Sequence, residues 1–340
     1  MSSSRDVLMG AFLERAGWVD AAQTVLAGDA SARRYFRLHR GSGSAVLMDA
    51  NPALGENVGR FLEVGSWLTA QGYSAPHILA ADPPNGFLLL EDLGDALVAR
   101  LVAATPARER ALYLGITDFL CDLQQRTPPA FLEIAQGAAL ADLSARVADW
   151  YLPAIGLSPG SAAGAIGSEV AAAYDRLTDG RLAVSLRDFH AENLIWLPDR
   201  TGVARFGLLD YQDAFVTHPA YDLVSLCQDA RRDVSADTEA ACVAAYTAGN
   251  GLDPADFGAV YALLGAQRAL RIVGIFARLC LKSGKVHYVD YIPRVWAYLE
   301  RNLRHPELWS LAGLVDALLP PPTEDRLRRI KEKCGTRPDL

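Results

Sequence analysis

The chain has 340 residues, of which 51% are hydrophobic, and its formal net charge is −7. A chain of this length buries a large core and is expected to fold into about two domains or lobes. Because basic residues are not in excess, we expect neither nucleic acid nor an anionic membrane as a partner.

The five cysteines lie far apart, and none has the spacing of a zinc site. They are therefore expected to be reduced thiols of a cytoplasmic protein. The first residues lack the basic and apolar regions of a signal peptide. The longest apolar segment, residues 257–281, is interrupted by three arginines and a glutamine, so we do not expect it to span a membrane.

The first quarter of the chain reads mostly as β-strands. Six elements are expected in the order strand, strand, strand, helix, strand and strand, at residues 23–28, 33–40, 44–50, 57–71, 77–82 and 87–92. A Gly-Ser-Gly-Ser tip joins the second and third strands, and Pro-Pro-Asn-Gly joins the last two, each as a hairpin. This pattern predicts a small antiparallel sheet lobe with one helix over residues 1–92.

After Gly94 the pattern becomes helical almost to the end. Helices are expected at residues 108–126, 140–150, 168–178, 220–230, 238–248, 254–281 and 289–303, with short strands within 182–210. We therefore predict a bilobal α+β fold, with a larger helical lobe over residues 93–320 and a polar, solvated tail over 321–340. A cleft between lobes is a common place for a ligand.

The densest group of polar side chains lies between two of those short strands. Asp188 and Asn193 form a D-x-x-x-x-N pattern, and Asp210 ends a later apolar strand. Carboxylate and amide oxygens are ligands that Mg²⁺ prefers, and a carboxylate that does not bind metal can orient and deprotonate a hydroxyl. The pattern indicates phosphoryl transfer, in which positioning and charge neutralisation supply most of the catalysis. Alone, the same spacing also occurs in ordinary capped turns.

Longer segments around these residues resemble a known superfamily. "RDFHAEN" is similar to the catalytic motif of the aminoglycoside phosphotransferase and choline kinase-like superfamily, and "LLDYQDA" is similar to its metal-binding strand end. The resemblance covers residues 22–310 and implies the protein-kinase fold. Within the superfamily, segments such as "GDASARRYFRL" and "GFLLLEDLGD" are most similar to bacterial kinases of the anomeric hydroxyl of N-acetylmuramate and N-acetylglucosamine.

The resemblance implies a role for each matching residue. Asp188 would be the catalytic base, and Asn193 and Asp210 would hold Mg²⁺ on the phosphates of ATP. Asp222 would anchor the catalytic loop. His190 would either bond to the backbone of that loop or face the substrate.

The nucleotide base is expected at the end of the last strand of the first lobe. There the resemblance implies that adenine pairs with the Glu91 carbonyl and the Leu93 N–H, and that Leu90 lines the site. An ordinary strand exit is the alternative interpretation of this segment.

Two features depart from the superfamily. Met48 stands where the third strand usually carries a lysine that contacts the phosphates, and the glycine-rich loop is reduced to Gly28. By strand alternation we expect Arg34 to point inward and to replace that lysine. The alternative is a pseudokinase that binds a nucleotide without catalysis. Glu63, on the helix that usually carries the lysine's acidic partner, is expected to face solvent.

Contacts to the acceptor are expected from the catalytic loop and from the helical lobe. The candidates are His190, Glu192, Asp213, Arg231, Arg268 and Arg271. Arg268, Arg271 and Arg278 fall on one side of their helix, where they either pair with acids inside the protein or bind an anionic substrate such as a lactyl carboxylate. Glu192 and Asp213 either bond to sugar hydroxyls or lie near the metal or solvent.

We therefore predict a cytoplasmic ATP- and Mg²⁺-dependent kinase whose partners are a nucleotide and a small-molecule sugar. The expected acceptor is the anomeric hydroxyl of an N-acetylated amino sugar. The alternatives are a kinase for an aminoglycoside, choline or another sugar, and a nucleotide-binding pseudokinase. A hydrolase is disfavoured because the chain has no G-x-S-x-G motif. Oligomeric state, choice of sugar and anomer, and ATP against GTP do not follow from these patterns.

Overall fold

The computed structural model describes residues 4–26 and 32–337. The chain folds into two compact units, one made of Met1–Pro106 with Glu192–Asp213 and the other of Ala107–Ala191 with Ala214–Leu340. We call them the sheet unit and the helical unit. Gly28, the remnant of the glycine-rich loop, lies outside the described residues.

The sheet unit contains a five-stranded antiparallel sheet with the strand order β1-β2-β3-β5-β4. The strands are β1 (Ala22–Leu26), β2 (Arg34–Arg40), β3 (Gly43–Asp49), β4 (Ile78–Asp82) and β5 (Phe87–Glu91). The turn before β5 requires Gly86, which has a φ of 70° and whose position would bring a Cβ to 1.9 Å from the Ala50 carbonyl oxygen. The five strands and both hairpins confirm the expected α+β pattern of this unit.

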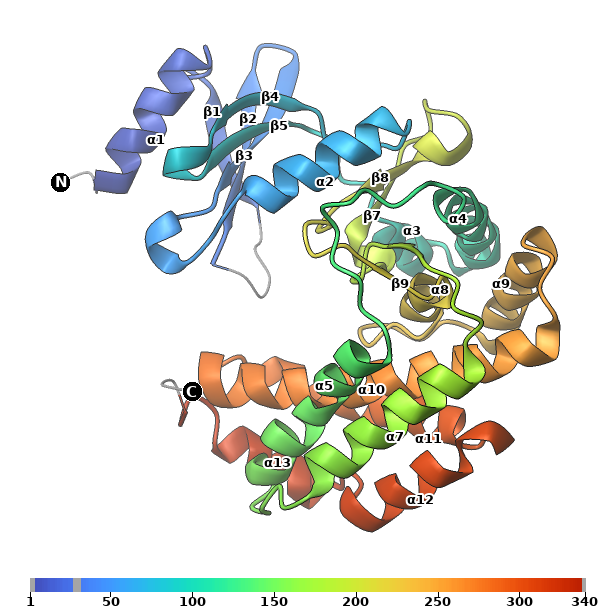
Figure 1. Ribbon diagram of the computed structural model, residues 1–340. Coiled ribbons are helices and arrows are strands. Elements are labelled where there is room, and N and C mark those ends of the chain that lie inside the picture. Colours follow the sequence, from blue (N-terminus) through green and yellow to red (C-terminus); the bar gives the residue numbers. More distant parts are fainter. Residues whose placement is uncertain (1–3, 27–31, 338–340) are drawn as a thin grey trace. The chain divides into compact units, whose positions relative to one another are not determined.

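Each face of this sheet buries apolar side chains, because residues alternate along the strands. Leu38 and Leu47 lie on one face and pack against Phe12 and Leu13 of helix α1 (Ser4–Arg15), which was not predicted. Figure 1 shows this helix beside the sheet. Met48, one position further on, lies on the opposite face with 0% exposure. Helix α2 (Gly59–Ala70) packs through Phe61 on Tyr211, with ring centroids 4.7 Å apart.

Two segments distant from the sheet in sequence belong to the same unit. Strands β7 (Leu194–Trp196) and β8 (Phe206–Leu208) form an antiparallel pair, and helix α3 (Val98–Ala104) contacts β7. The N–H of Leu208 donates to the Ser74 carbonyl, and that of Trp196 donates to the Ala96 carbonyl. The candidate metal ligands on this hairpin are therefore part of the sheet unit, whereas the expected lobe boundary after residue 92 assigns them to the helical part.

The helical unit is built around α10 (Pro254–Ser283), whose start is capped by Asp253 and whose end is capped by Gly284 at a φ of 68°. Among the described residues α10 alone is long and apolar enough to cross a membrane, and 89% of its most apolar window is buried inside the protein. The other helices are α4 (Glu109–Leu123), α5 (Gly137–Arg146), α6 (Leu152–Ala154), α7 (Ala162–Leu177), α8 (Ala220–Cys227), α9 (Ala236–Gly249), α11 (Ile292–Leu303), α12 (Trp309–Leu318) and α13 (Glu324–Glu332). A short pair, β6 (Ala183–Ser185) and β9 (Phe215–Thr217), completes the unit.

Most residues of the C-terminal segment are exposed, as expected for a solvated tail, but the segment is anchored at one point. Helix α13 docks onto the end of α10, where Ile330 is fully buried and its carbonyl lies 3.5 Å from the Cys280 thiol. The N–H of Gly335 also donates to the Cys280 carbonyl at 2.9 Å. One buried isoleucine and a backbone hydrogen bond hold this segment, although its charged composition predicts exposure to solvent. An average over the composition of a segment does not reveal a single buried residue.

Candidate active site

A buried carboxylate holds the loop that carries Asp188. Asp222, on α8, accepts hydrogen bonds from the Ser185 hydroxyl at 2.6 Å, the Leu186 N–H at 2.6 Å and the Arg187 N–H at 3.1 Å. Burial raises the pKa of Asp222 to about 6, against these bonds, which act to lower it. The ionised carboxylate thus connects the end of β6 to the start of the loop.

The residue before Asp188 has a conformation that side chains rarely adopt. Arg187 has a φ of 69°, in the left-handed region. Its carbonyl accepts a hydrogen bond from Arg268 on α10 at 3.0 Å, and the second guanidinium nitrogen of Arg268 donates to the Ser225 hydroxyl at 2.5 Å. Such backbone strain persists only where the surroundings hold it, and it is common at functional sites.

Asp188 lies among positive charges. Nη2 of Arg271 lies 3.9 Å from Asp188 Oδ1, and Nη1 of Arg271 lies 3.1 Å from the Tyr221 hydroxyl. Loss of solvent acts to raise the pKa of Asp188, but nearby positive groups outweigh it, so the pKa is below its ordinary value. These groups are Arg271, Arg268 and Arg187, and the His190 ring acts in the same direction. Asp188 is therefore ionised at neutral pH.

The arginines on α10 divide into two sets. Arg268 and Arg271 are each only 5% exposed and contact the loop of Asp188. Arg278 is half-buried, and burial together with the charge of Arg146 lowers its pKa. These contacts favour contacts within the protein, and not substrate binding, for Arg268 and Arg271. Their partners, however, are mostly a carbonyl and hydroxyls and not the acids that were expected.

His190 contacts a second arginine. Its Nε2 lies 3.0 Å from Nη1 of Arg231, and a guanidinium can only donate, so Nε2 accepts and the ring proton lies on Nδ1. The backbone N–H of Arg231 donates to Asp229 Oδ1 at 2.8 Å, and this bond holds the backbone of Arg231 next to Asp229. Arg231 itself is half-buried.

Asn193 and Asp210 lie side by side in the sheet unit. They stand at the adjacent ends of the paired strands β7 and β8, where the Leu209 N–H donates to the Asn193 carbonyl at 2.9 Å. Asp210 has a φ of 55°, and its Oδ1 accepts from Gln212 at 2.8 Å. Two hard oxygen donors fit Mg²⁺, which takes few protein ligands and the rest from phosphate and water. No cluster of three His, Cys, Asp or Glu side chains occurs within residues 4–26 and 32–337, so a metal bound entirely by such side chains does not fit there.

The candidate base-binding residues lie at the end of β5. Leu90 is 3% exposed and Leu93 is 9% exposed. The Glu91 side chain is held by Arg200 Nη2 at 2.5 Å and by the His77 N–H at 3.2 Å. Because these two contacts engage the Glu91 carboxylate, the Glu91 carbonyl is the better candidate to accept a hydrogen bond from a nucleotide base.

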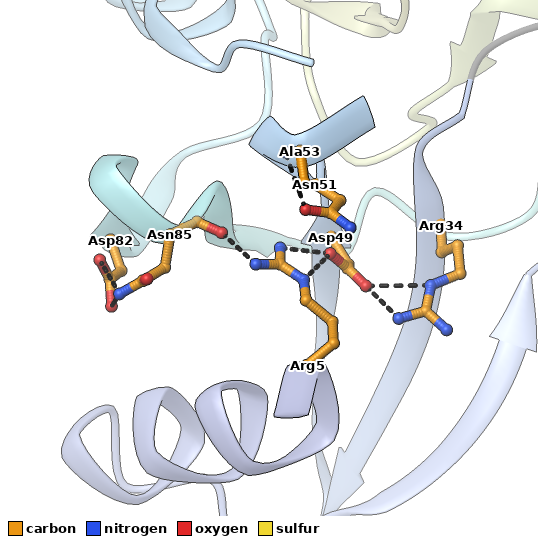
Figure 2. A network of polar contacts seen from close by, with 7 residues as sticks. All are labelled: Arg5, Arg34, Asp49, Asn51, Ala53, Asp82 and Asn85. Atoms are coloured by element: carbon orange, nitrogen blue, oxygen red, sulfur yellow. Dashed lines mark hydrogen bonds and ion pairs between the residues drawn. The ribbon is translucent and has the colours of Figure 1, made fainter. Parts of the chain in front are cut away.

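Arg34 lies on the sheet face of Phe36 and Leu38, as strand alternation predicts, but that face is opposite the one of Met48. Figure 2 shows its guanidinium on Asp49, which is 1% exposed and also accepts from Arg5 of α1 at 2.9 Å. Arg34 and Asp49 are cross-strand partners, so both lie on the sheet face opposite Met48. The cross-strand partner that shares the face of Met48 is Tyr35. The expected substitution of Arg34 for the lysine is therefore at odds with the register.

The remaining candidates lie at the surface of their own units. Glu192 and Asp213 are both exposed. Glu63 is 55% exposed and lies 3.7 Å from Arg60, as expected for a residue facing solvent. Sequence reasoning missed one charged pair, in which Arg33 Nε lies 2.8 Å from Glu56 Oε2. Strand alternation predicted that Arg34 points inward, but the Arg33 side chain is 11% exposed and the Arg34 side chain is 52% exposed.

The candidate residues thus belong to both units. Asp188 and His190 lie in the helical unit, and Asn193 and Asp210 lie in the sheet unit, joined by the 3₁₀ turn Ala191–Asn193. The helical unit thus supplies an ionised carboxylate on a strained loop, and the sheet unit supplies two oxygen donors that fit Mg²⁺. These are the kinds of group that phosphoryl transfer uses, so the class of protein they indicate is a phosphotransferase.

Comparison with known proteins agrees with this class. Residues 22–263 match the model of the phosphotransferase enzyme family, and the chain belongs to that family. It is an enzyme with the α+β kinase-like fold predicted above. Its solved structural neighbours include a choline/ethanolamine kinase family protein from Mesorhizobium loti, with a TM-score of 0.59 and 18% identity over 92% of this chain and 99% of that one. An aminoglycoside phosphotransferase from Streptomyces rimosus, solved with ADP and streptomycin, has a TM-score of 0.53 and 20% identity over 78% and 98% of the two chains.

Two proteins whose sequences are more similar to this chain than those of the structural neighbours above share one name. A protein of Caulobacter vibrioides called N-acetylmuramate/N-acetylglucosamine kinase is 40% identical, over 94% of this chain and 98% of its own. A protein of the same name from Pseudomonas aeruginosa is 34% identical, over 89% and 91% of the two chains.

Proposed function

We propose that the protein is an ATP-dependent kinase that phosphorylates the anomeric hydroxyl of N-acetylmuramate, N-acetylglucosamine or both, in the cytoplasm. The supporting observation is identity of 40% across nearly the whole of both chains to a kinase named for these two sugars. Asp188, Asn193 and Asp210, the residues that phosphoryl transfer needs, are all present in this chain.

Asp188 is the proposed base. The anomeric oxygen attacks the γ-phosphorus, the bond from that phosphorus to the bridging oxygen of ADP breaks, and the hydroxyl proton passes to the Asp188 carboxylate. A hemiacetal hydroxyl is more acidic than an ordinary alcohol, so a carboxylate with a low pKa need only orient it and accept its proton late. The products are a sugar 1-phosphate and ADP.

Arg268 and Arg271 are proposed to position this base. Arg268 holds the strained Arg187 carbonyl, and Arg271 keeps Asp188 ionised from 3.9 Å. Because both are engaged in this way, Arg231 is the better candidate to bind a lactyl carboxylate. His190, Glu192 and Asp213 are the remaining candidates for contacts to the sugar.

The sheet unit is proposed to bind the nucleotide. Asn193 and Asp210 would hold Mg²⁺, which neutralises phosphate charge when bound. Leu90, the Glu91 carbonyl and the Leu93 N–H would contact the adenine. The proposed partners are accordingly this nucleotide and one sugar.

A coupled assay of ADP formation tests the proposal. N-acetylglucosamine and N-acetylmuramate should be consumed with ATP and Mg²⁺, whereas their reduced alditols, which lack the anomeric centre, should be inert. Phosphorus NMR of the product should show coupling to the anomeric proton. Coupling to the position-6 methylene protons, or turnover only with choline or an aminoglycoside, would contradict the proposed acceptor.

A nucleotide-binding pseudokinase is the second candidate, because fully buried Met48 replaces the lysine of the third strand. It predicts nucleotide binding without ADP formation for every acceptor. Turnover with either sugar excludes it.

A further inference from the structure

The sheet unit contains a nearly buried ion pair, and its arginine lies directly before strand β2. Arg33 Nε lies 2.8 Å from Glu56 Oε2, and their side chains are 11% and 15% exposed. The Arg33 guanidinium also forms a hydrogen bond with the Tyr35 hydroxyl. Burying two charges is costly, and a buried pair is weak evidence for stability, so a role beyond stability deserves a test here.

This pair lies on the side of the sheet that Met48 faces. Tyr35 and Met48 are cross-strand partners, so their side chains emerge on one face. Burial raises the pKa of Tyr35, and the charge of Asp210 acts in the same direction. Arg33, Tyr35 and Met48 therefore lie on one side of the sheet, in the unit that also contains the candidate metal ligand Asp210.

The adjacent arginine is directed elsewhere. Arg34 contacts Asp49 on the opposite face, and its side chain is 52% exposed. Arg34 shares that carboxylate with Arg5 (Figure 2). Two arginines next to each other in the chain thus serve opposite faces of the sheet.

We propose that Arg33 is the cation that binds the nucleotide phosphates in place of a third-strand lysine, and that Glu56 holds it in position. A guanidinium presents five N–H donors in a rigid fork, enough to bond a carboxylate and a phosphate at once. Glu63, on α2, is 55% exposed and pairs with Arg60, so the acidic partner comes from the segment before this helix. The inference rests on the proposed use of ATP.

The test is calorimetric binding of ATP with Mg²⁺ and of adenosine, without any sugar, to the full chain. Arg33→Met should weaken ATP binding roughly 10- to 100-fold, the usual range for losing a charged hydrogen bond, and leave adenosine binding unchanged. Arg33→Lys, which keeps a charge without the fork, should lose less. Arg34→Met is the matched control, and its ratio of ATP to adenosine affinity should equal that of the wild type.

A wild-type ratio in Arg33→Met, or an equal loss in Arg34→Met, would overturn the inference. If Arg33→Met does not fold, Glu56→Gln is measured in the same way, since it keeps the guanidinium and removes its charged anchor. Selective loss of ATP affinity supports the inference, and an unchanged ratio overturns it. Wild-type protein that binds no nucleotide would instead refute the proposed function, so the two failures are distinct.

Discussion

Two carboxylates in this protein lie close to arginines, yet they are suited to different tasks. Asp49, at the end of β3, contacts Arg5 and Arg34 directly and is 1% exposed. In the helical unit, Nη2 of Arg271 lies 3.9 Å from Asp188 Oδ1, and the Asp188 side chain is 37% exposed.

The difference shows how the distance to an arginine distinguishes a structural carboxylate from the proposed base. Direct contact from two sides uses the oxygens of Asp49 and joins α1 to the sheet. At a longer distance Arg271 still favours the charge of Asp188, because Coulomb energy falls only gradually with separation. The exposure of Asp188 meanwhile leaves it accessible to a hydroxyl.

The largest effect is expected when the proposed base is neutralised. Asp188→Asn should lower kcat by roughly 10²- to 10⁴-fold, the range for general acid–base catalysis, with unchanged ATP affinity and unfolding midpoint. Steady-state kinetics, calorimetry and thermal unfolding measure the three quantities. Near-normal turnover would refute the proposed mechanism.

The matched change at the structural carboxylate should behave oppositely. Asp49→Asn should lower the free energy of unfolding by about 1–3 kcal/mol, because it leaves two guanidiniums without their anion. The kcat of the folded fraction should not change. Urea denaturation gives the stability, and a loss of kcat with normal stability would show that this network serves catalysis.

Removing the charge near Asp188 should have a smaller effect, visible as a pH shift. Arg271 helps to hold the pKa of Asp188 below its ordinary value. In Arg271→Met this pKa should rise, so the acidic limb of kcat moves to higher pH while activity above that limb is largely kept. Both sugars should be affected equally. A selective loss with N-acetylmuramate would instead make Arg271 a ligand for the lactyl group.

The smallest expected effect concerns the loop anchor. The pKa of Asp222 is about 6, above its ordinary value, so protonation stabilises the fold below pH 4 and that contribution is lost as the pH rises through 6. Activity should change in the opposite direction, because the loop donors need an ionised acceptor. We expect kcat to fall as the pH drops below about 6. This fall in kcat at low pH should be absent in the folded Asp222→Asn variant. If the fall persists in that variant, it is caused by the titration of another group.

The sequence by itself determined the α+β class, the five strands, most long helices and the identity of Asp188, Asn193 and Asp210 as candidate site residues. These features depend on local patterns. Alternation marks strands, a 3.6-residue period marks helices, and the D-x-x-x-x-N motif spans a single loop.

Only the tertiary structure decided which charges meet. Arg33 and Arg34 are neighbours in the chain, but the register with Met48 and the packing of α1 assign them to opposite faces. Arg271 reaches Asp188 because α10 lies against the loop. Helix, strand and charge patterns specify what a side chain is and which way it points along its own element. The partner of a buried charge depends on elements that meet only when the chain has folded, because Coulomb and hydrogen-bond energies follow distance in space and not separation in sequence.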